Sequence, residues 1–320
     1  MIKMKSKKKV LFIDTTHPYL IDGLKSLGFT CDHFNSFTKS EYETIVQNYF
    51  GIIIRSKFSL DKAFLEKAKK LAFIARVGSG MENVDTGYAE ARGISCLNAP
   101  EGNRDSVGEH ATGMLLALLN HMVKADGQLR HGIWKREENR GVEIMGKTIA
   151  IIGYGNTGSA FAQRLQGFQA NVIAYDKYKS DFSDDYVREV TMAEIFREAD
   201  ILSMHVPLTD ETTYLINDKY ISRFKKNIFL INTSRGKVVK TSALVSNLKS
   251  GKVSGAALDV LEYENLSFED LRQKEFDEDF SWLADAENVI LSPHVAGLTH
   301  ESYLKLAEVI FEKIKAINIY

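Results

Sequence analysis

The chain has 320 residues, of which 44% are hydrophobic and 26% charged, and this globular composition over such a length favours two domains. Lys and Arg number 41 against 42 Asp and Glu, so there is no overall bias toward nucleic acid or an anionic membrane. The basic N-terminal residues precede only a short apolar run, Val10 to Ile13, which breaks at Asp14, so we expect neither a signal peptide nor a membrane span. Cys31 and Cys96 lie in strand-like runs without metal-ligand spacing, which predicts buried thiols, no metal site and a cytoplasmic protein.

Short apolar runs alternate with helical patterns in the first part of the chain. These runs are Val10 to Ile13, Thr30 to Phe34, Ile52 to Ile54 and Phe73 to Ala75. Such alternation is typical of βαβ units and predicts a parallel sheet.

Two turns in this region are candidates for binding a small anion. Arg55 and Ser56 follow the Ile52 to Ile54 run, and Gly78-Ser79-Gly80 follows the Phe73 to Ala75 run. Glycines allow consecutive N–H groups to point at a carboxylate. Arg55 taken alone is equally consistent with an ordinary surface charge. We expect all five residues to contribute to substrate binding.

A turn-rich joint at residues 98–103 precedes a long apolar-periodic segment from Asp105 to about Lys124. The joint predicts a domain boundary, and the segment predicts a helix that crosses between domains or faces another subunit. Gly108 is expected to be a local weak point of that helix. Glu109 and His110 are interpreted as packing or hinge residues.

A glycine-rich stretch between Lys147 and Asp176 has the features of a dinucleotide-binding unit. Gly153, Gly155 and Gly158 have G-x-G-x-x-G spacing between a strand-like run and a helical segment, and a second strand-like run ends on Asp176. The glycines would allow a tight turn, close approach of a pyrophosphate and close helix packing, while Asp176 would accept hydrogen bonds from the adenosine ribose. The predicted cofactor-binding residues in this stretch are Gly153, Gly155, Asn156, Thr157, Gly158 and Asp176.

Five more apolar runs follow Asp176. They are Val187 to Val190, Ile201 to His205, Ile228 to Ile231, Ala256 to Val260 and Val289 to Leu291. With the two strands of the glycine-rich unit, they predict about seven strands in a doubly wound parallel sheet. Ligands of such sheets bind at the carboxyl ends of strands, where His205, Pro207, Thr233 and Asp259 are expected to meet the cofactor.

The residues that follow these runs suggest hydride transfer between a nicotinamide and a carbinol carbon. His294 can exchange the alcohol proton, and Glu264 can fix its tautomer by hydrogen bonding to the far ring nitrogen. Arg235 can grip a substrate carboxylate, and Asp259 can hold the nicotinamide carboxamide. Each has an ordinary alternative, such as a structural ion pair for Arg235 or a solvated loop charge for Glu264. Their convergence after separate strands favours the functional interpretation.

Segments along nearly the whole chain resemble the D-isomer-specific 2-hydroxyacid dehydrogenase family, which includes phosphoglycerate, D-lactate, glycerate and hydroxypyruvate enzymes. The matching segments are RVGSGMENVD, NAPEGNRDSVGEH, GKTIAIIGYGNTGS, HVPLTDETTYLIN, NTSRGKVV, GAALDVLEYE and SPHVAGLT. The resemblance implies that Arg235, Glu264 and His294 are the catalytic residues. It also implies an α/β protein with two doubly wound parallel-sheet domains, a Rossmann NAD-binding domain (residues 104–298) inserted into a flavodoxin-like substrate domain (residues 1–103 and 299–320). The active site would lie in a cleft whose closure excludes water.

The chain departs from the family pattern after the expected catalytic glutamate. Asn265 stands where the family usually has proline, and the stretch to Asn288 is longer and more acidic than usual, so Glu262 is a rival for the role of Glu264. The glutamate also argues against formate as substrate, for which family members carry glutamine.

The expected activity is NAD-dependent interconversion of a small D-2-hydroxy acid and its 2-oxo acid, including 3-phosphoglycerate among the candidates. Asp176 should repel the 2′-phosphate of NADP, although Lys177 and Lys179 lie beside it. Family corepressors make a non-catalytic NAD sensor the alternative. The segment from Asp105 through Trp134 suggests a homodimer, and neither nucleic acid nor membrane is expected as a partner.

Overall fold

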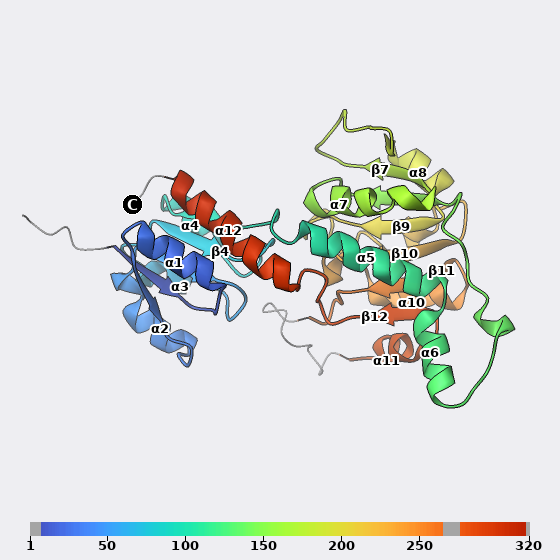
Figure 1. The fold of residues 1–320 in the computed structure, drawn as a ribbon, viewed down its shortest axis with the longest axis horizontal. Helices are drawn as coiled ribbons and strands as arrows, with labels where there is room; N and C mark the ends of the chain where they lie inside the picture. The colour runs from blue at the N-terminus through green and yellow to red at the C-terminus, as the bar shows by residue number, and fades with distance from the viewer. Residues whose placement is uncertain (1–7, 265–275, 318–320) are drawn as a thin grey trace, which may run out of the picture. The chain divides into compact units, whose positions relative to one another are not determined.

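The computed structural model describes residues 8–264 and 276–317, which divide into two compact units. Residues 8–103 and 298–317 form the first unit, and residues 104–264 and 276–297 form the second (Figure 1). Each unit contains one parallel sheet, of five strands in the first unit and seven in the second. The predicted fold class, α/β with two parallel-sheet domains, is therefore confirmed.

The first unit is built on a sheet with strand order β2-β1-β3-β4-β5, the order of flavodoxin-like folds. Its strands are β1 (Lys9–Phe12), β2 (Thr30–His33), β3 (Gly51–Ile54), β4 (Phe73–Arg76) and β5 (Ser95–Leu97). Its helices are α1 (Pro18–Ser26), α2 (Lys39–Ile45), α3 (Lys62–Lys67), α4 (Thr86–Ala91) and α12 (His300–Ala316). Leu11 packs into one hydrophobic cluster, whereas its neighbours Val10 and Phe12 pack into another. Because successive side chains of a strand face opposite sides, both faces of this sheet are buried.

The C-terminal helix α12 packs beside the N-terminal helix α1 (Figure 1). A Cβ atom at Gly23 of α1 would lie 2.7 Å from the Phe311 ring of α12, so only glycine permits this approach. Thr299 accepts a hydrogen bond from the Ser302 N–H and caps the start of α12. The chain thus leaves the first unit after residue 103 and returns to it at residue 298.

The second unit is built on a sheet with strand order β12-β11-β10-β9-β6-β7-β8. Renumbered from β6, this is the 3-2-1-4-5-6 order of dinucleotide-binding sheets with one strand added. The strands are β6 (Thr148–Ile152), β7 (Asn171–Tyr175), β8 (Val187–Glu189), β9 (Ile201–Met204), β10 (Ile228–Asn232), β11 (Val253–Leu258) and β12 (Val289–Leu291). The helices are α5 (Arg104–Leu119), α6 (Met122–Arg130), α7 (Asn156–Arg164), α8 (Met192–Glu198), α9 (Asp218–Ile221), α10 (Thr241–Lys249) and α11 (Glu278–Asp285). The prediction of about seven strands in this part of the chain is confirmed.

Short 3₁₀ turns complete the described structure. They are Val46–Asn48, Glu137–Asn139, Gln166–Phe168 and Gly236–Val238.

The helix expected from Asp105 to about Lys124 is wrong at its C-terminal end. Helix α5 stops at Leu119, and α6 begins at Met122. His121 between them has a φ of +52°, and the Asn120 amide donates to the Leu116 carbonyl oxygen. A left-handed residue cannot continue an α-helix, so the segment forms two helices although its apolar pattern runs on.

Gly108 has a packing role in addition to its expected effect on the stability of α5. Gly108 is buried, and a Cβ atom there would lie 2.9 Å from the backbone carbonyl carbon of Ala160 in α7. The missing side chain lets α5 pack closely against α7, the helix that follows the glycine-rich turn. Gly108 thus helps to place that helix.

Cys31 in β2 and Cys96 in β5 are half-buried free thiols, so the expectation of buried thiols is only partly correct. Burial raises the pKa of each thiol to about 11, which keeps both protonated at neutral pH. Among residues 8–264 and 276–317, no helix combines the length and hydropathy that crossing a membrane requires.

Candidate active site

The glycine-rich turn after β6 has the geometry that its sequence predicts. Gly153 has a φ of +91°, and a side chain there would overlap the carbonyl oxygen of His205. A side chain at Gly158 would overlap the carbonyl oxygen of Gly153. These two glycines therefore permit the tight turn and the close packing of α7 against β6.

The N-terminus of α7 has room for a phosphate group. A Cβ atom at Gly155, the N-cap residue, would have open space around it, and no side chain caps this end of the helix. Uncapped N–H groups and the helix dipole favour an anion at such a position. Asn156 and Thr157 form the first turn of this helix.

Asp176 lies directly after β7, and its carboxylate orders the loop around it. Oδ2 accepts a hydrogen bond from the Tyr154 N–H at 2.7 Å, and Oδ1 accepts from the N–H groups of Tyr178 and Lys179 at 2.9 and 3.1 Å. A carboxylate has about four acceptor positions, which leaves one for a ribose hydroxyl. The residues of this sheet edge thus fit an adenine dinucleotide.

His205, at the end of β9, is a buried neutral histidine. Nε2 lies 2.8 Å from Ser203 Oγ, Nδ1 lies 3.2 Å from Thr157 Oγ1, and the ring stacks on Phe161. Burial lowers the pKa of His205 to about 3. Its ring thus links β9 to α7, and its expected contact with the cofactor stays a prediction, as does that of exposed Pro207.

The turn after β10 presents Arg235 and a buried hydroxyl group. The Asn232 amide donates to the Arg235 carbonyl oxygen at 3.0 Å and accepts hydrogen bonds from Ser234, which fixes the backbone of the turn. Thr233 Oγ1 is buried and has no hydrogen-bond partner in the described part of the chain. A buried hydroxyl without a partner is costly, so a bound group is its natural partner.

Asp259, after β11, is 1% exposed and holds the turn that follows β12. Oδ1 accepts hydrogen bonds from Ser292 Oγ at 2.6 Å and the Val295 N–H at 2.9 Å, and Oδ2 accepts from the Ala296 N–H at 2.9 Å. His110 Nε2 of α5 lies 3.1 Å from the same Ser292 hydroxyl. Asp259 therefore fixes the backbone on both sides of His294, while its expected contact with the nicotinamide stays a prediction.

His294 itself has a left-handed backbone, with a φ of +54°. This conformation costs a non-glycine residue on the order of 1–2 kcal/mol. The His294 N–H donates to the Asp259 carbonyl oxygen at 2.7 Å, which helps to retain the conformation. The left-handed backbone sets the direction in which the His294 imidazole leaves the turn.

The His294 ring meets Glu264. Nδ1 lies 2.6 Å from Glu264 Oε2, while Glu264 Oε1 accepts a hydrogen bond from the Leu261 N–H at 2.5 Å. Glu262 instead accepts a hydrogen bond from the Thr241 N–H at 2.8 Å. The structure therefore places Glu264 against His294, and this geometry favours Glu264 over Glu262 as the partner of the imidazole.

Gly236 brings the turn of Arg235 close to the loop of Glu264. A side chain at Gly236 would overlap the carbonyl oxygen of Leu261, so the two turns can pack only with glycine there. Polar residues after β10, β11 and β12 thus share one edge of the sheet, as the strand order requires.

In the first unit, the backbone of Arg55 and Ser56 is already held by Asp14. Asp14 Oδ2 accepts hydrogen bonds from the N–H groups of Arg55 at 2.5 Å and Ser56 at 3.2 Å. The Arg55 guanidinium lies over the Tyr303 ring at 5.9 Å. A role of Arg55 and Ser56 in substrate binding stays a prediction.

The turn after β4 differs from the turn of Arg55 and Ser56 in whether its backbone N–H groups have acceptors. The Asn98 amide donates to the Ser79 carbonyl oxygen at 2.6 Å, and Ser79 Oγ lies 2.5 Å from Asn103 Oδ1. The N–H groups of Ser79 and Gly80 have no acceptor within the described residues. The turn thus holds two donors in a fixed place, beside Gly78.

Asp14 and Gly236 contribute to these arrangements and were not predicted to do so, and the contact of His110 with Ser292 fits its interpretation as a packing residue. Asp14 ends the apolar run of β1, which is the same signal that identified Asp259 after β11. Gly236 gives no such signal, because its contact joins segments far apart in the sequence. Asn265 and the acidic stretch up to residue 275 lie outside the described residues.

A parallel sheet with a glycine-rich turn, an acid after the second strand and a histidine–glutamate pair defines an NAD-binding dehydrogenase of the α/β class. The comparisons with known proteins agree. Residues 112–296 match the family model described as "D-isomer specific 2-hydroxyacid dehydrogenase, NAD binding domain". The chain belongs to the D-isomer specific 2-hydroxyacid dehydrogenase family and is an NAD-dependent enzyme of this kind.

Relatives with different substrates match this chain about equally well. Hydroxypyruvate reductase of Thermotoga maritima is 33% identical over 302 residues, which cover 94% of each chain. D-3-phosphoglycerate dehydrogenase of Archaeoglobus fulgidus is 33% identical over 308 residues, 96% of this chain but only 56% of that protein. The structure of D-lactate dehydrogenase from Aquifex aeolicus with NAD and lactic acid is 28% identical, with a TM-score of 0.82 and coverage of 96% of this chain and 95% of that one.

Proposed function

We propose that the enzyme reduces a small, unphosphorylated 2-oxo acid to its 2-hydroxy acid with NADH, forming the D isomer where the product is chiral, with hydroxypyruvate and glyoxylate as the leading substrates. The observation that carries the proposal is the contact of His294 Nδ1 with Glu264 Oε2 at 2.6 Å, on the sheet edge of the glycine-rich turn. The relative that matches along 94% of both chains is named a hydroxypyruvate reductase. 3-Phosphoglycerate is the second candidate, because phosphoglycerate dehydrogenases are similar at 32–33% identity.

His294 acts as the general acid in this proposal. Nicotinamide, when bound, supplies the hydride, so the protein has to deliver a proton to the substrate oxygen. Because Glu264 engages Nδ1, the proton passes through Nε2, and the carboxylate orients the ring and stabilises the imidazolium. The His294 side chain retains 24% exposure against 11% for Glu264, which suits a donor that reaches the substrate and a partner that does not.

Arg235 binds the substrate carboxylate in this proposal. A guanidinium offers a two-pronged donor that matches a carboxylate. The Ser79 and Gly80 N–H groups, which lack acceptors within the described residues, supply further donors. Residues 104–298 then form the NAD-binding domain, and the buried Thr233 hydroxyl and Asp259 meet the nicotinamide end.

A panel of 2-oxo acids tests the activity directly. NADH oxidation is followed with hydroxypyruvate, glyoxylate, pyruvate, phosphohydroxypyruvate and branched 2-oxo acids, and the product is resolved by chiral chromatography. We expect the highest kcat/KM with hydroxypyruvate or glyoxylate, and a D product from hydroxypyruvate, because the glycolate formed from glyoxylate is achiral. An L product, or a clear preference for phosphohydroxypyruvate, would contradict the proposal. No turnover of any of these acids would contradict the proposed substrate class.

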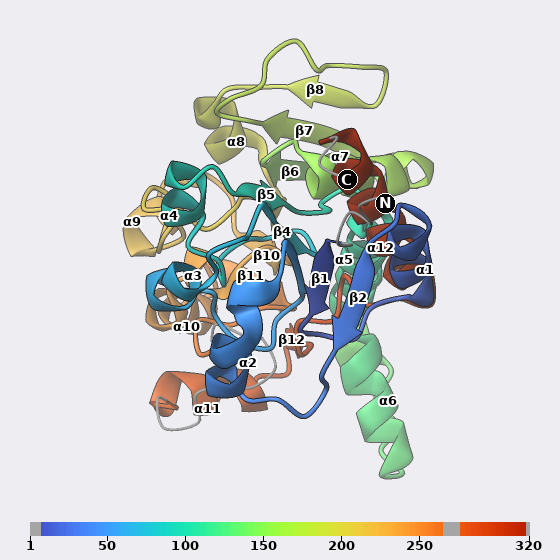
Figure 2. The ribbon, with the colours of Figure 1, turned by 90° about the vertical axis from the view of Figure 1, so that its left-hand side faces the viewer.

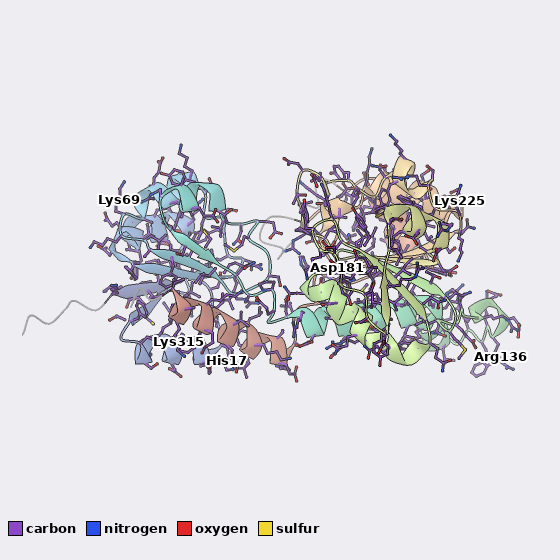
Figure 3. All side chains as sticks on the ribbon, turned by 90° about the horizontal axis from the view of Figure 1, so that it is seen from above. His17, Lys69, Arg136, Asp181, Lys225 and Lys315 are labelled. Carbon is purple, nitrogen blue, oxygen red and sulfur yellow. The ribbon has the colours of Figure 1, made fainter. Side chains whose placement is uncertain are left out.

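The enzyme is proposed to work as a homodimer through the segment from α6 to β6. Helix α6 has no buried residue, and Figure 2 shows it extending away from the sheet of its own unit. Arg136, labelled in Figure 3, lies in the same segment. Exposed apolar side chains gather here, and such patches mark association sites. They are Met122, Val123, Leu129, Ile133, Trp134 and Met145.

Sedimentation velocity tests the assembly. The wild type should sediment as two chains, and Trp134→Glu combined with Leu129→Glu should shift it to one. Tyr186→Glu, at a side chain 54% exposed elsewhere in the same unit, is the matched control and should stay dimeric. A monomeric wild type would rule out this part of the proposal.

A further inference from the structure

An ion pair joins the loops that follow β7 and β9. Lys177 Nζ lies 2.5 Å from Glu211 Oε2, and the Tyr178 hydroxyl lies 3.4 Å from the same oxygen. Strands β7 and β9 are the two neighbours of β6 in the sheet. The ion pair therefore spans the glycine-rich turn on the side of Asp176, where the adenosine ribose is expected.

The turn that carries Glu211 is well fixed. The Thr209 N–H donates to Thr212 Oγ1 at 2.8 Å, Thr212 Oγ1 donates to the Pro207 carbonyl oxygen at 2.6 Å, and Thr213 Oγ1 donates to the Thr209 carbonyl oxygen at 2.7 Å. Three hydroxyl groups thus hold the turn and keep Glu211 opposite Lys177.

The stability of the fold does not account for the pair. The side chains of Lys177 and Glu211 are 54% and 59% exposed, and exposed ion pairs contribute about 0–1 kcal/mol. Their hydrogen bond raises the pKa of Lys177 and lowers that of Glu211, so both groups stay charged at neutral pH. The effect of the pair is better sought in the local charge around the ribose site.

The loops that follow β7 and β9 carry both positive and negative side chains in this region. Asp176 and Glu211 are negative, while Lys177 and Lys179 are positive. Lys179 Nζ donates to the Tyr154 carbonyl oxygen at 3.1 Å, so both ammonium groups are bound within the chain. A ribose 2′-phosphate carries a charge of about −1.5 to −2 and would need one of them as its partner.

We propose that Glu211 is a specificity-determining residue, which keeps Lys177 from serving as a partner for a 2′-phosphate and so disfavours NADP. Asp176 repels the phosphate, and Glu211 engages Lys177, a cation directly after Asp176 in the sequence. The inference rests on the placement of the adenosine ribose at Asp176. It goes beyond the activity, because it assigns cofactor choice to a residue of a different loop.

Binding of NADPH and NADH to the purified full chain tests the inference without turnover. Dissociation constants are measured by nucleotide fluorescence for the wild type, Glu211→Gln and Asp210→Asn. Asp210 is the matched control, because it is exposed on the same turn and its loss removes the same charge. Glu211→Gln should lower the ratio of the NADPH to the NADH dissociation constant about 5-fold, the effect of roughly one exposed charge pair, and Asp210→Asn should change it less than about 2-fold.

A second variant shows whether Lys177 mediates the effect. The gain in relative NADPH affinity, measured as the fall in the ratio of dissociation constants, should be absent when Lys177→Met is combined with Glu211→Gln. The gain should also shrink between about 0.05 M and 0.5 M salt, because exposed charges are screened. An unchanged ratio in Glu211→Gln, an equal gain in Asp210→Asn, or a gain that survives Lys177→Met would each overturn the inference. Failure of the 2-oxo acid panel would leave these binding ratios intact, so the two proposals fail separately.

Discussion

The strand ends of the two sheets present their polar groups in different ways. In the seven-stranded sheet, side chains hold one another, and Asp259 fixes the turn of His294 through four backbone or hydroxyl groups. In the five-stranded sheet, the turn after β4 keeps the N–H groups of Ser79 and Gly80 without acceptors among the described residues. Proton transfer needs a side chain fixed in advance, whereas an anion site needs donors that are still available.

The largest effect is expected from a substitution that breaks the hydrogen bonds of Asp259 in the second unit. Asp259→Asn keeps one oxygen and replaces the other with an amide NH2, so the N–H group of either Val295 or Ala296 loses its acceptor and faces a donor. We expect the free energy of unfolding to fall by about 2–4 kcal/mol and kcat to fall about 100-fold. Urea unfolding and NADH oxidation measure the two effects. Ser292→Ala removes the hydrogen bond to Asp259 Oδ1 and the contact with His110 Nε2 but leaves the bonds of Asp259 to the Val295 and Ala296 N–H groups, so it should cost only about 1 kcal/mol. Full activity and stability in Asp259→Asn would show that the turn needs no such support.

The partner of His294 is tested by a matched pair of substitutions. Glu264→Gln keeps the size of the side chain but removes the charge that faces the imidazole, and should lower kcat roughly 10- to 100-fold. Glu262→Gln should lower kcat by less than about 3-fold, because a glutamine oxygen can still accept from the Thr241 N–H. The reverse order of effects would assign the role to Glu262.

A smaller effect, on substrate affinity, is expected from the turn after β4, which carries the N–H groups of Ser79 and Gly80. Asn98→Ala removes the hydrogen bond to the Ser79 carbonyl oxygen and so loosens the turn. We expect KM for the 2-oxo acid to rise about 5-fold, the value of one hydrogen bond, with a smaller change in kcat. Steady-state kinetics provide the measurement, and an unchanged KM would argue against substrate binding at this turn.

His205 makes stability depend on pH, and this is the smallest effect expected near neutrality. The folded-state pKa of about 3 lies below the ordinary histidine pKa of 6.5, so between these values only the unfolded chain binds the proton. The free energy of unfolding should therefore fall as pH decreases from 6.5 toward 3, by up to about 1.4 kcal/mol per pH unit. His205→Gln should reduce this slope in urea titrations at several pH values. An identical slope in the variant would show that His205 is not the group responsible.

Much of the second unit could be predicted because its strands are buried on both faces. All five residues of β6 are buried, so its apolar run reads directly as a strand of a parallel sheet. The rule that ligands meet the carboxyl ends of strands then selected Glu264 and His294, whose contact follows from the strand order.

The features that could not be predicted depend on backbone conformation or on contacts between distant segments, and neither leaves a periodic pattern of apolar residues. The apolar pattern continues past the end of α5, so the sequence does not show where this helix stops. Only the left-handed backbone of His121 shows it. Gly108 matters because α7 passes close by, and a glycine in a helical pattern otherwise indicates a weak helix. The hydrogen bonds from Arg55 and Ser56 to Asp14 join segments about 40 residues apart, and an arginine after a strand does not disclose such a partner.

The turnover of His294→Ala tests most directly whether the histidine–glutamate pair transfers the proton. With the leading 2-oxo acid, kcat should fall about 10²- to 10⁴-fold, the range attributed to general acid–base catalysis, while the dissociation constant of NADH stays within about 2-fold of the wild type. Turnover close to that of the wild type, with NADH still bound, would contradict the assignment of His294.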